Sequence, residues 1–183
     1  IKWDIPELGD HCPDICVVFE ITHQSENRNE FVVTEEGSRP ALIIEIVSPR
    51  YRKIDREEKV KEYAWAGVQE YIILDRRQQR GQWLDEAIGY RLIEGFFLPI
   101  TPDENGMVLS DAIGVRIGLE NSKVVLVDQA SGERLLTSLD LERQVEQEQQ
   151  RAEQERQRAE QERQRAERLA ERLRQLGIDP DQL

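Results

Sequence analysis

The chain has 183 residues, enough for one domain with a substantial hydrophobic core. Its formal net charge of −12 argues against a protein that binds nucleic acid through bulk electrostatic attraction. No run of about eighteen apolar residues and no signal-peptide pattern occur, so the sequence predicts neither a transmembrane helix nor a secreted protein. The two cysteines, Cys12 and Cys16, are too few for a disulfide framework and indicate reduced thiols in a cytoplasmic protein.

The N-terminal forty residues predict one strand and little else. The chain begins at Ile1 rather than at a Met, and residues 1–10 lack a periodic pattern, so we expect that upstream sequence is missing. Residues 15–19 are mostly apolar and predict a strand, with Asp14 at its beginning. Residues 20–38 are largely polar and predict a loop or a weak hairpin.

The next stretch, residues 41–47, reads Ala-Leu-Ile-Ile-Glu-Ile-Val. A run this rich in Ile and Val, without polar alternation, predicts a central strand that is covered on both faces. Glu45 lies in its middle, and an ionised carboxylate in such a place is costly unless it is paired or binds a cation. Glu45 therefore either meets a buried Arg or Lys, or it serves chemistry.

A basic segment follows the strand. It is compatible with a phosphate-bearing substrate, and equally with an ordinary solvated loop and helix start. Its cations are Arg50, Arg52, Lys53, Arg56, Lys59 and Lys61.

Helix and strand signals follow in turn. Asp55 and Glu58 have the spacing of a capping box, which predicts a helix from Asp55 to about Ala66. Gly67 is placed as the helix stop, and residues 69–75 predict another buried strand. A strand, a helix and a strand within so short a stretch predict a right-handed crossover between two parallel strands.

The rest of the chain changes character twice. Residues 81–137 carry regular turn signals and predict an antiparallel β half joined to the crossover. Its candidate strands lie near 90–93, 96–100, 115–119 and 124–127. From Ser138 a seven-residue repeat rich in Glu, Gln and Arg runs without Gly or Pro to Leu176, which predicts one long helix.

The seam of this helix is poor for a coiled coil. Heptad position a is Ala in the middle of the repeat, position d is Glu there, and only the ends are apolar. We expect a solvated appendage that pairs weakly through Leu169, Leu173 and Leu176. The predicted organisation is a domain at 1–137 and a helical tail at 138–183.

Several of these motifs occur in an order that resembles a known nuclease superfamily. They are Pro13-Asp14, then Leu42 to Pro49 with Glu45 inside, then Asp55, Lys59 and Tyr63, then Gly67 to Asp75. In this order they resemble the PD-(D/E)XK superfamily, in particular the bacterial domain family described as "putative restriction endonuclease". The resemblance extends loosely to about Thr137, and the helical tail lies outside it.

The resemblance implies a restriction-endonuclease-like α/β (α+β) fold, with a mixed β-sheet core, and hydrolysis of phosphodiester bonds in DNA. It implies Mg²⁺ or Mn²⁺ as cofactor, held by Asp14, Glu45 and the backbone carbonyl of Ile46; these cations prefer oxygen ligands. It assigns Lys59 as the catalytic ammonium, with Tyr63 either assisting it or simply packing. It also implies a homodimer.

Two departures from the superfamily pattern keep other readings open. The Lys usually found two residues after the Glu is replaced here by Val47, and no helix with a further acidic residue precedes Asp14. One alternative is a catalytically degenerate nuclease fold that acts as a protein-interaction module through its charged helix. The other is that Glu45 simply pairs with a buried Arg in a domain of unrelated chemistry.

Overall fold

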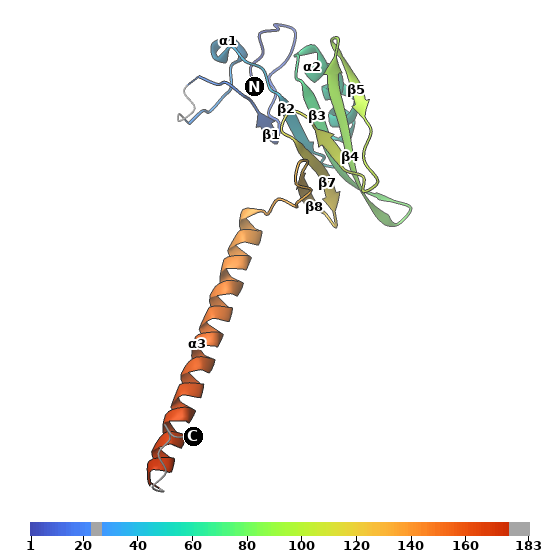
Figure 1. Cartoon of the computed structure of the whole chain (residues 1–183). Helices are drawn as coiled ribbons and strands as arrows, with labels where there is room; N and C mark the ends of the chain where they lie inside the picture. The colour runs from blue at the N-terminus through green and yellow to red at the C-terminus, as the bar shows by residue number, and fades with distance from the viewer. Residues whose placement is uncertain (23–26, 176–183) are drawn as a thin grey trace. The chain divides into compact units, whose positions relative to one another are not determined.

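The computed structural model describes residues 1–22 and 27–175. Residues 1–135 form one compact unit, and the chain from Leu136 onward forms a second. The first unit contains a five-stranded mixed sheet, a three-stranded sheet and short helices, and one long helix makes up most of the described part of the second (Figure 1). The predicted mixed fold with a long C-terminal helix is confirmed.

The five-stranded sheet has the spatial order β1-β2-β3-β4-β5. Its strands are β1 (Ile15–Val17), β2 (Leu42–Ile46), β3 (Glu70–Gln79), β4 (Gln82–Ile93) and β5 (Phe96–Ile100). Strands β2 and β3 are parallel and all other neighbours are antiparallel. Between the parallel pair run a π-helical turn, η1 (Ile54–Glu58), and α2 (Lys59–Trp65), so the predicted crossover is confirmed.

The second sheet covers one face of the first. It is antiparallel and consists of β6 (Val108–Ser110), β7 (Val115–Glu120) and β8 (Lys123–Asp128). Side chains of even-numbered positions in β2 and β3, such as Leu42 and Ile72, pack against Val108 and Ile117 from this sheet. The sequence-predicted antiparallel half is therefore present, but β4 begins eight residues before the predicted strand at 90–93.

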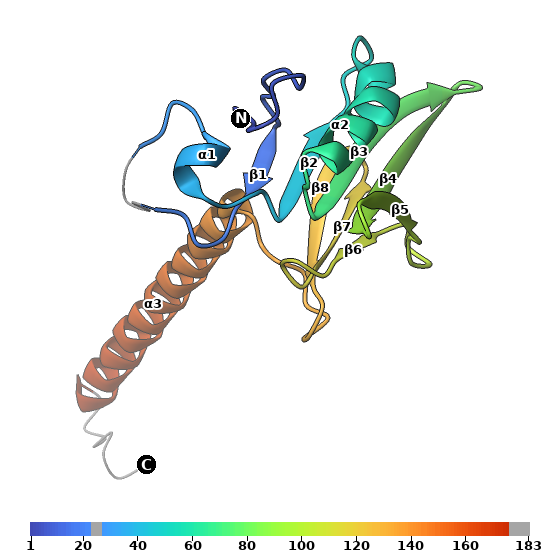
Figure 2. The same cartoon turned by 90° about the horizontal axis from the view of Figure 1, so that it is seen from above.

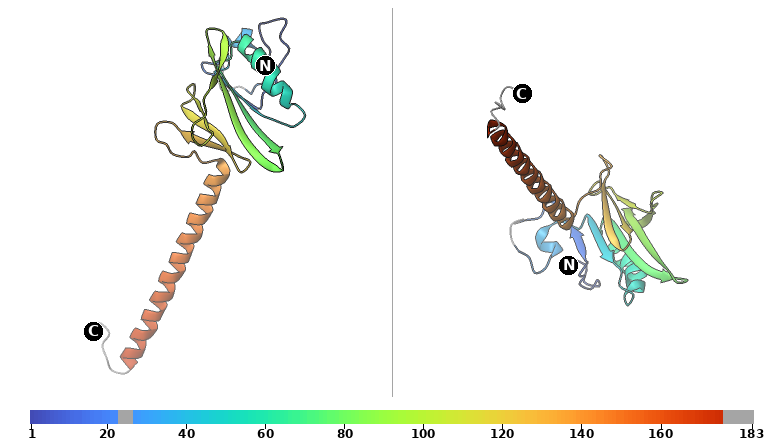
Figure 3. Two further views of the ribbon diagram at one scale, coloured as in Figure 1. Left: turned by 90° about the vertical axis from the view of Figure 1, so that its right-hand side faces the viewer. Right: turned by 90° about the horizontal axis from the view of Figure 1, so that it is seen from below.

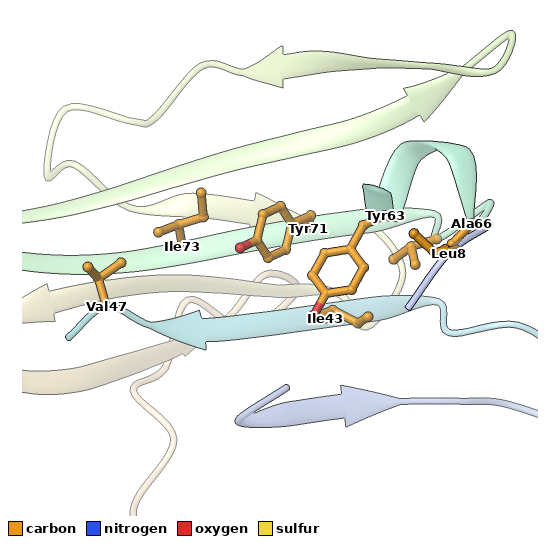
Figure 4. Packing of buried hydrophobic residues seen from close by; sticks show 8 residues of the cluster. Leu8, Ile43, Val47, Tyr63, Ala66, Tyr71 and Ile73 are labelled. Carbon is orange, nitrogen blue, oxygen red and sulfur yellow. The ribbon is translucent and has the colours of Figure 1, made fainter. Parts of the chain in front are cut away.

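Helix α2 covers the opposite face of β2 and β3 (Figure 2). Odd-numbered side chains of the two strands, including Ile43 and Tyr71, pack here against Tyr63 and Ala66 (Figure 4). Because successive side chains of a strand point to opposite faces, Glu45 shares the face of Ile43. This alternation is what directs the Glu45 carboxylate towards α2.

Two local predictions about helices were wrong. Asp55 is not an N-cap, because helical residues already begin at Arg52 and Asp55 is buried inside the π-helical turn. The segment predicted as a loop or weak hairpin contains a short helix, α1 (Val33–Glu36), and residues 23–26 lie outside the described part. The helix stop at Gly67 is confirmed, since its φ of +77° is a conformation that favours glycine.

The C-terminal helix α3 spans Ser138–Gln175 and is continuous (Figure 3). Its apolar residues are largely exposed: Leu141 is 50% exposed, Val145 53% and Leu169 62%. The side chain of Leu173 and all of Leu176 lie outside the described residues, so the predicted pairing seam is only partly visible. Across the described residues, no helix combines the length and the apolar character needed to cross a membrane.

Candidate active site

The buried carboxylate of Glu45 forms the centre of the site. Its side chain is almost fully buried, and its Oε1 accepts hydrogen bonds from the Lys59 ammonium and the Tyr63 hydroxyl, both at 2.9 Å. Lys59 and Tyr63 are four residues apart and therefore project from the same side of α2. The cation expected beside Glu45 is thus present, but it is only partly buried, and it comes from the crossover helix.

The second oxygen of this carboxylate is left open. Among the described residues, no hydrogen bond reaches Glu45 Oε2, and Glu45 lines a pocket that opens beside β2. A buried ionised carboxylate that served only to neutralise a cation would be expected to use both of its oxygens. The arrangement leaves one oxygen available to a ligand.

Asp14 reaches the same place from the neighbouring strand. β1 pairs with β2 in a register that joins Ile15 to Ile44, and continuing this register places Asp14 opposite Glu45. The Asp14 Oδ2 atom accepts a hydrogen bond of 2.7 Å from the backbone N–H of Ile46. Asp14 itself is exposed, and its Oδ1 accepts no hydrogen bond from the described residues.

Lys59 is held between two carboxylates. Its ammonium lies 2.9 Å from Glu45 Oε1 and 2.8 Å from Asp55 Oδ1. Burial alone would lower the pKa of Lys59, but the hydrogen bonds to Asp55 and Glu45 outweigh burial and raise that pKa above its ordinary value. At neutral pH Lys59 is therefore a positively charged hydrogen-bond donor and not a base.

Asp55 is the site residue that the sequence reasoning assigned to the wrong task. It is buried and forms an ion pair with Lys59. Its backbone carbonyl accepts a 2.9 Å hydrogen bond from the Tyr71 hydroxyl. The capping-box spacing to Glu58 suggested a helix start instead. The four-residue spacing between Asp55 and Lys59 was the local signal that could have identified this pair.

Tyr63 both packs and holds the carboxylate. Its ring lies edge-on to Tyr71, with ring centroids 4.9 Å apart, and its side chain extends from α2 towards β2 (Figure 4). Burial raises the pKa of Tyr63 first, and the nearby Glu45 charge raises it further. Tyr63 therefore remains a neutral hydroxyl that donates to Glu45, and no hydrogen bond joins it to Lys59 within the described residues.

Val47 occupies a buried apolar position next to the site and brings no charge to Glu45. It lies two residues after Glu45 on the α2 side of β2 and is buried in the cluster that contains Tyr63 and Tyr71. The apolar position packs under α2, and Lys59 brings a positive charge to Glu45 from above the same face. The ammonium beside Glu45 therefore comes from the helix and not from the strand.

The pocket of about 460 Å³ brings four of the five predicted site residues together. Its lining contains Asp14, Glu45, Ile46 and Lys59, with Asp55 beside them, whereas Tyr63 contacts it through Glu45. In the described part of the chain, no group of three His, Cys, Asp or Glu side chains is arranged to hold a metal ion. A divalent cation would therefore have two carboxylates as side-chain ligands, which suits Mg²⁺, because Mg²⁺ usually binds one or two carboxylates and keeps several waters.

The chain matches the model of a known protein family. The model of the Uma2 family, described as "putative restriction endonuclease", matches residues 1–115, which is more than half of the chain. The chain belongs to this family. The resemblance predicted from the sequence motifs is confirmed, and the matched part includes all the predicted site residues. No curated protein and no solved structure matches the chain.

The Uma2 match lies entirely within the first compact unit. It covers the five-stranded sheet, η1 and α2, and it ends at Val115, the first residue of β7. Helix α3 lies outside it. Membership in the Uma2 family therefore supports a nuclease-like function for the first unit and says nothing about α3.

Proposed function

We propose that the protein is an endonuclease that uses a divalent metal ion to hydrolyse phosphodiester bonds in DNA. The observation that carries the proposal is the meeting of the Asp14 and Glu45 carboxylates with the Lys59 ammonium at one pocket. Each carboxylate has one oxygen that accepts no hydrogen bond from the described residues. Two oxygen ligands next to a fixed positive charge are the elements that phosphoryl chemistry requires.

The residues present fit a divalent cation. Asp14, Glu45 and the backbone carbonyl of Ile46 would hold Mg²⁺ or Mn²⁺, which prefer oxygen ligands. When bound there, the cation supplies a Lewis acid that polarises the phosphate and helps to activate water.

The chain's own residues then have separate roles. Lys59 stays protonated and stabilises the negative charge that develops on the phosphate oxygens during hydrolysis. Asp55 keeps the ammonium in place from the side opposite Glu45. Tyr63 fixes Oε1 of Glu45 through its hydroxyl, so that Oε2 is left for the cation. Tyr63 and Asp55 are thus positioning residues, and Lys59 is the catalytic one.

Calorimetric titration with Mn²⁺ tests the carboxylate site without any assumption about substrate. We expect the wild-type protein to bind Mn²⁺ and Glu45→Gln to lose binding, because the substitution removes the ionised ligand. Glu86→Gln is the matched control, since Glu86 is a carboxylate outside the pocket and should leave binding unchanged. Lys59→Ala should still bind Mn²⁺ but lose cleavage of DNA.

The proposal fails if the wild-type protein binds no Mn²⁺, or if Glu45→Gln binds it as tightly as the wild type. Unfolding of each variant in urea shows whether a lost signal reflects a lost ligand or a lost fold.

Helix α3 favours a second candidate function, a degenerate nuclease fold that acts as an interaction module. Leu141, Val145 and Leu169 are each at least half exposed, and Val47 occupies the position where the superfamily usually has its Lys. In this case α3 would recruit a helical partner, and absence of Mn²⁺ binding by the wild type would favour it. For the endonuclease we propose a homodimer, since nuclease folds that cut both DNA strands are often dimeric.

A further inference from the structure

A second pocket is lined by other residues of the segment that carries Asp55 and Lys59. Cations dominate its lining, which is unexpected in a chain with a net charge of −12. The lining residues are Pro49, Arg50, Arg52, Lys53, Arg56, Glu57, Arg77 and Tyr90. Five of these eight residues are basic, and Glu57 is the single acidic one.

Two acids, the buried Asp75 and the partly exposed Glu86, hold three of the guanidinium groups in place. Arg52 binds Asp75 through Nε and Nη2 at 3.0–3.1 Å, and Arg56 Nη1 lies 2.7 Å from Asp75 and 2.8 Å from Glu86. Arg77 Nη1 also contacts both acids. Each guanidinium has five N–H donors, so Arg56 and Arg77, which bind through Nη1, keep most of theirs for a ligand. Side chains fixed in this way lose little entropy when an anion binds.

Arg50 and Lys53 are exposed, and neither forms an ion pair with any described residue. The Arg50 guanidinium lies over the Tyr51 ring, 5.4 Å from its centroid. Neutralising Asp75 and Glu86 needs two cations, and the pocket supplies five. The cations are therefore more numerous than Asp75 and Glu86 require.

One segment forms the wall between the two pockets. Tyr51, Asp55 and Lys59 line the carboxylate pocket, whereas Lys53 and Arg56 line the basic one. A helix with its side chains is roughly 10–12 Å thick. Since each nucleotide advances about 3.4 Å along a DNA strand, this thickness corresponds to about three nucleotides.

We propose that the basic pocket binds phosphate groups of the DNA backbone and leads one strand across the segment to the carboxylate pocket. Guanidinium forks match the geometry of phosphate oxygens, and Arg50 and Lys53 add charge that no described acid neutralises. A local basic pocket also explains how an acidic protein could approach DNA. The proposal rests on the proposed function, because it takes DNA as the substrate of the neighbouring site.

Fluorescence anisotropy with a labelled DNA duplex of about 20 base pairs tests the pocket, with EDTA present so that the metal site makes no contribution. The test variant is the double substitution Arg50→Ala with Lys53→Ala, which leaves the Asp75 cluster intact. The matched control is Lys61→Ala with Lys123→Ala, two exposed cations outside the pocket lining. Both variants change the net charge equally.

We expect the test variant to bind DNA roughly tenfold more weakly at about 0.1 M salt, and to lose up to about 2 from the slope of log K against log salt. The control should remain within about twofold of the wild type, because a pocket acts locally. Wild-type affinity in the test variant, an equal loss in the control, or no DNA binding by the wild type would each overturn the proposal. So would binding of poly-glutamate, but not of DNA, that depends on Arg50 and Lys53.

These outcomes are separate from those of the Mn²⁺ titration. Suppose that Mn²⁺ binding depends on Glu45 but that DNA binding is unchanged by substitution of Arg50 and Lys53. This result would refute the proposed role of the basic pocket and leave the proposed metal site standing. DNA binding that needs Arg50 and Lys53 in a protein without Mn²⁺ affinity would keep the pocket and sink the proposed hydrolysis.

Discussion

Two buried carboxylates lie on adjacent parallel strands and face the same side of the sheet, yet their surroundings differ. Asp75 of β3 is fully buried, and three arginines bind its two oxygens at 2.7–3.2 Å. Glu45 of β2 is almost as buried, but within the described parts of the chain only its Oε1 accepts hydrogen bonds. Burial therefore does not separate a structural acid from a candidate ligand; the partners of each oxygen do.

The balance of positive and negative charge also differs between the surroundings of Asp75 and those of Glu45. Burial alone would raise the pKa of Asp75, but the hydrogen bonds from Arg52 and Arg56 outweigh it and lower that pKa. Asp75 thus remains ionised and fully engaged. At Glu45 one ammonium is shared with Asp55, which leaves this pair of carboxylates with one negative charge in excess. An excess of negative charge beside a pocket is what a divalent cation would neutralise.

The largest expected effect comes from substituting Asp75, whose two carboxylate oxygens are both bound by arginines. Asp75→Asn should lower the free energy of unfolding by about 3 kcal/mol, because it leaves clustered arginines without their buried counter-charge. Urea titration monitored by circular dichroism measures this loss. Glu86→Gln is the control, since Glu86 is partly exposed and shares Arg56 and Arg77 with Asp75; it should cost less than about 1 kcal/mol. Equal losses in the two variants would refute a special role for Asp75.

The pH dependence of stability should differ between the two centres. The folded pKa of Asp75 lies below its ordinary 3.8, so its contribution is complete above that pH and is lost on acidification below it. The folded pKa values of Lys59 and Tyr63 lie above their ordinary 10.5 and 10.0. Their contributions are complete below these values and are lost as the pH rises through the folded pKa values.

Urea unfolding from about pH 3 to about pH 11 tests this division. Asp75→Asn should flatten the acid side of the profile and leave the alkaline side unchanged. Lys59→Met should flatten part of the alkaline side, with the rest remaining because of the tyrosines. Acid and alkaline sides that change together in either variant would contradict independent centres.

The smallest effect is expected at the hydroxyl that fixes Glu45. Tyr63→Phe removes one hydrogen bond to a buried carboxylate and keeps the ring, so it should cost about 1–2 kcal/mol in urea. Tyr90→Phe is the matched control, because Tyr90 packs on the same face and its hydroxyl has no hydrogen bond to the described residues. An equal cost in both variants would mean that the hydrogen bond contributes nothing measurable.

The sequence predicted those site residues whose positions follow from the local pattern of a strand or a helix, namely Glu45, Lys59 and Tyr63. The apolar run around Glu45 predicts a buried strand, and alternation along it directs the carboxylate towards whatever helix follows. Lys59 and Tyr63 lie four residues apart on that helix, so finding one of them finds the other. The resemblance to the nuclease family added Asp14, which the register of β1 and β2 brings beside Glu45.

Asp55 and Asp75 were missed for different reasons: a capping-box pattern misassigned Asp55, and the partners of Asp75 come from a distant part of the chain. The local pattern of Asp55 is that of a helix start, but its partners are Lys59 and the hydroxyl of Tyr71, and the second lies on β3. Asp75 ends a predicted strand, and only the folded crossover brings Arg52 and Arg56 to it. The contacts of Asp75 leave no periodic trace in the sequence, whereas the four-residue spacing of Asp55 and Lys59 was overlooked because the capping-box pattern explained Asp55 in another way.

The long hairpin of β3 and β4 was missed for a different reason. Its two-residue turn is Arg80-Gly81, and both residues have positive φ, 52° and 81°. Such turns usually have Asn or Asp at the first of these positions, so an Arg there gives no turn signal. The strand ends beside the turn are also exposed, and they place polar Gln78 and Gln79 opposite Trp83 and Gln82, so no regular apolar alternation marks them as strands.

The π-helical turn at Ile54–Glu58 has a consequence for how this segment can vary. Each residue advances an α-helix by about 100°, so removing one residue from the turn would rotate Arg52 by that angle relative to Lys59. Arg52 could then not remain on Asp75 while Lys59 reaches Glu45. The length of this stretch is thus as tightly specified as its side chains. Substitutions can be tolerated on its exposed side. An insertion or deletion, in contrast, would break either the contact of Arg52 with Asp75 or that of Lys59 with Glu45.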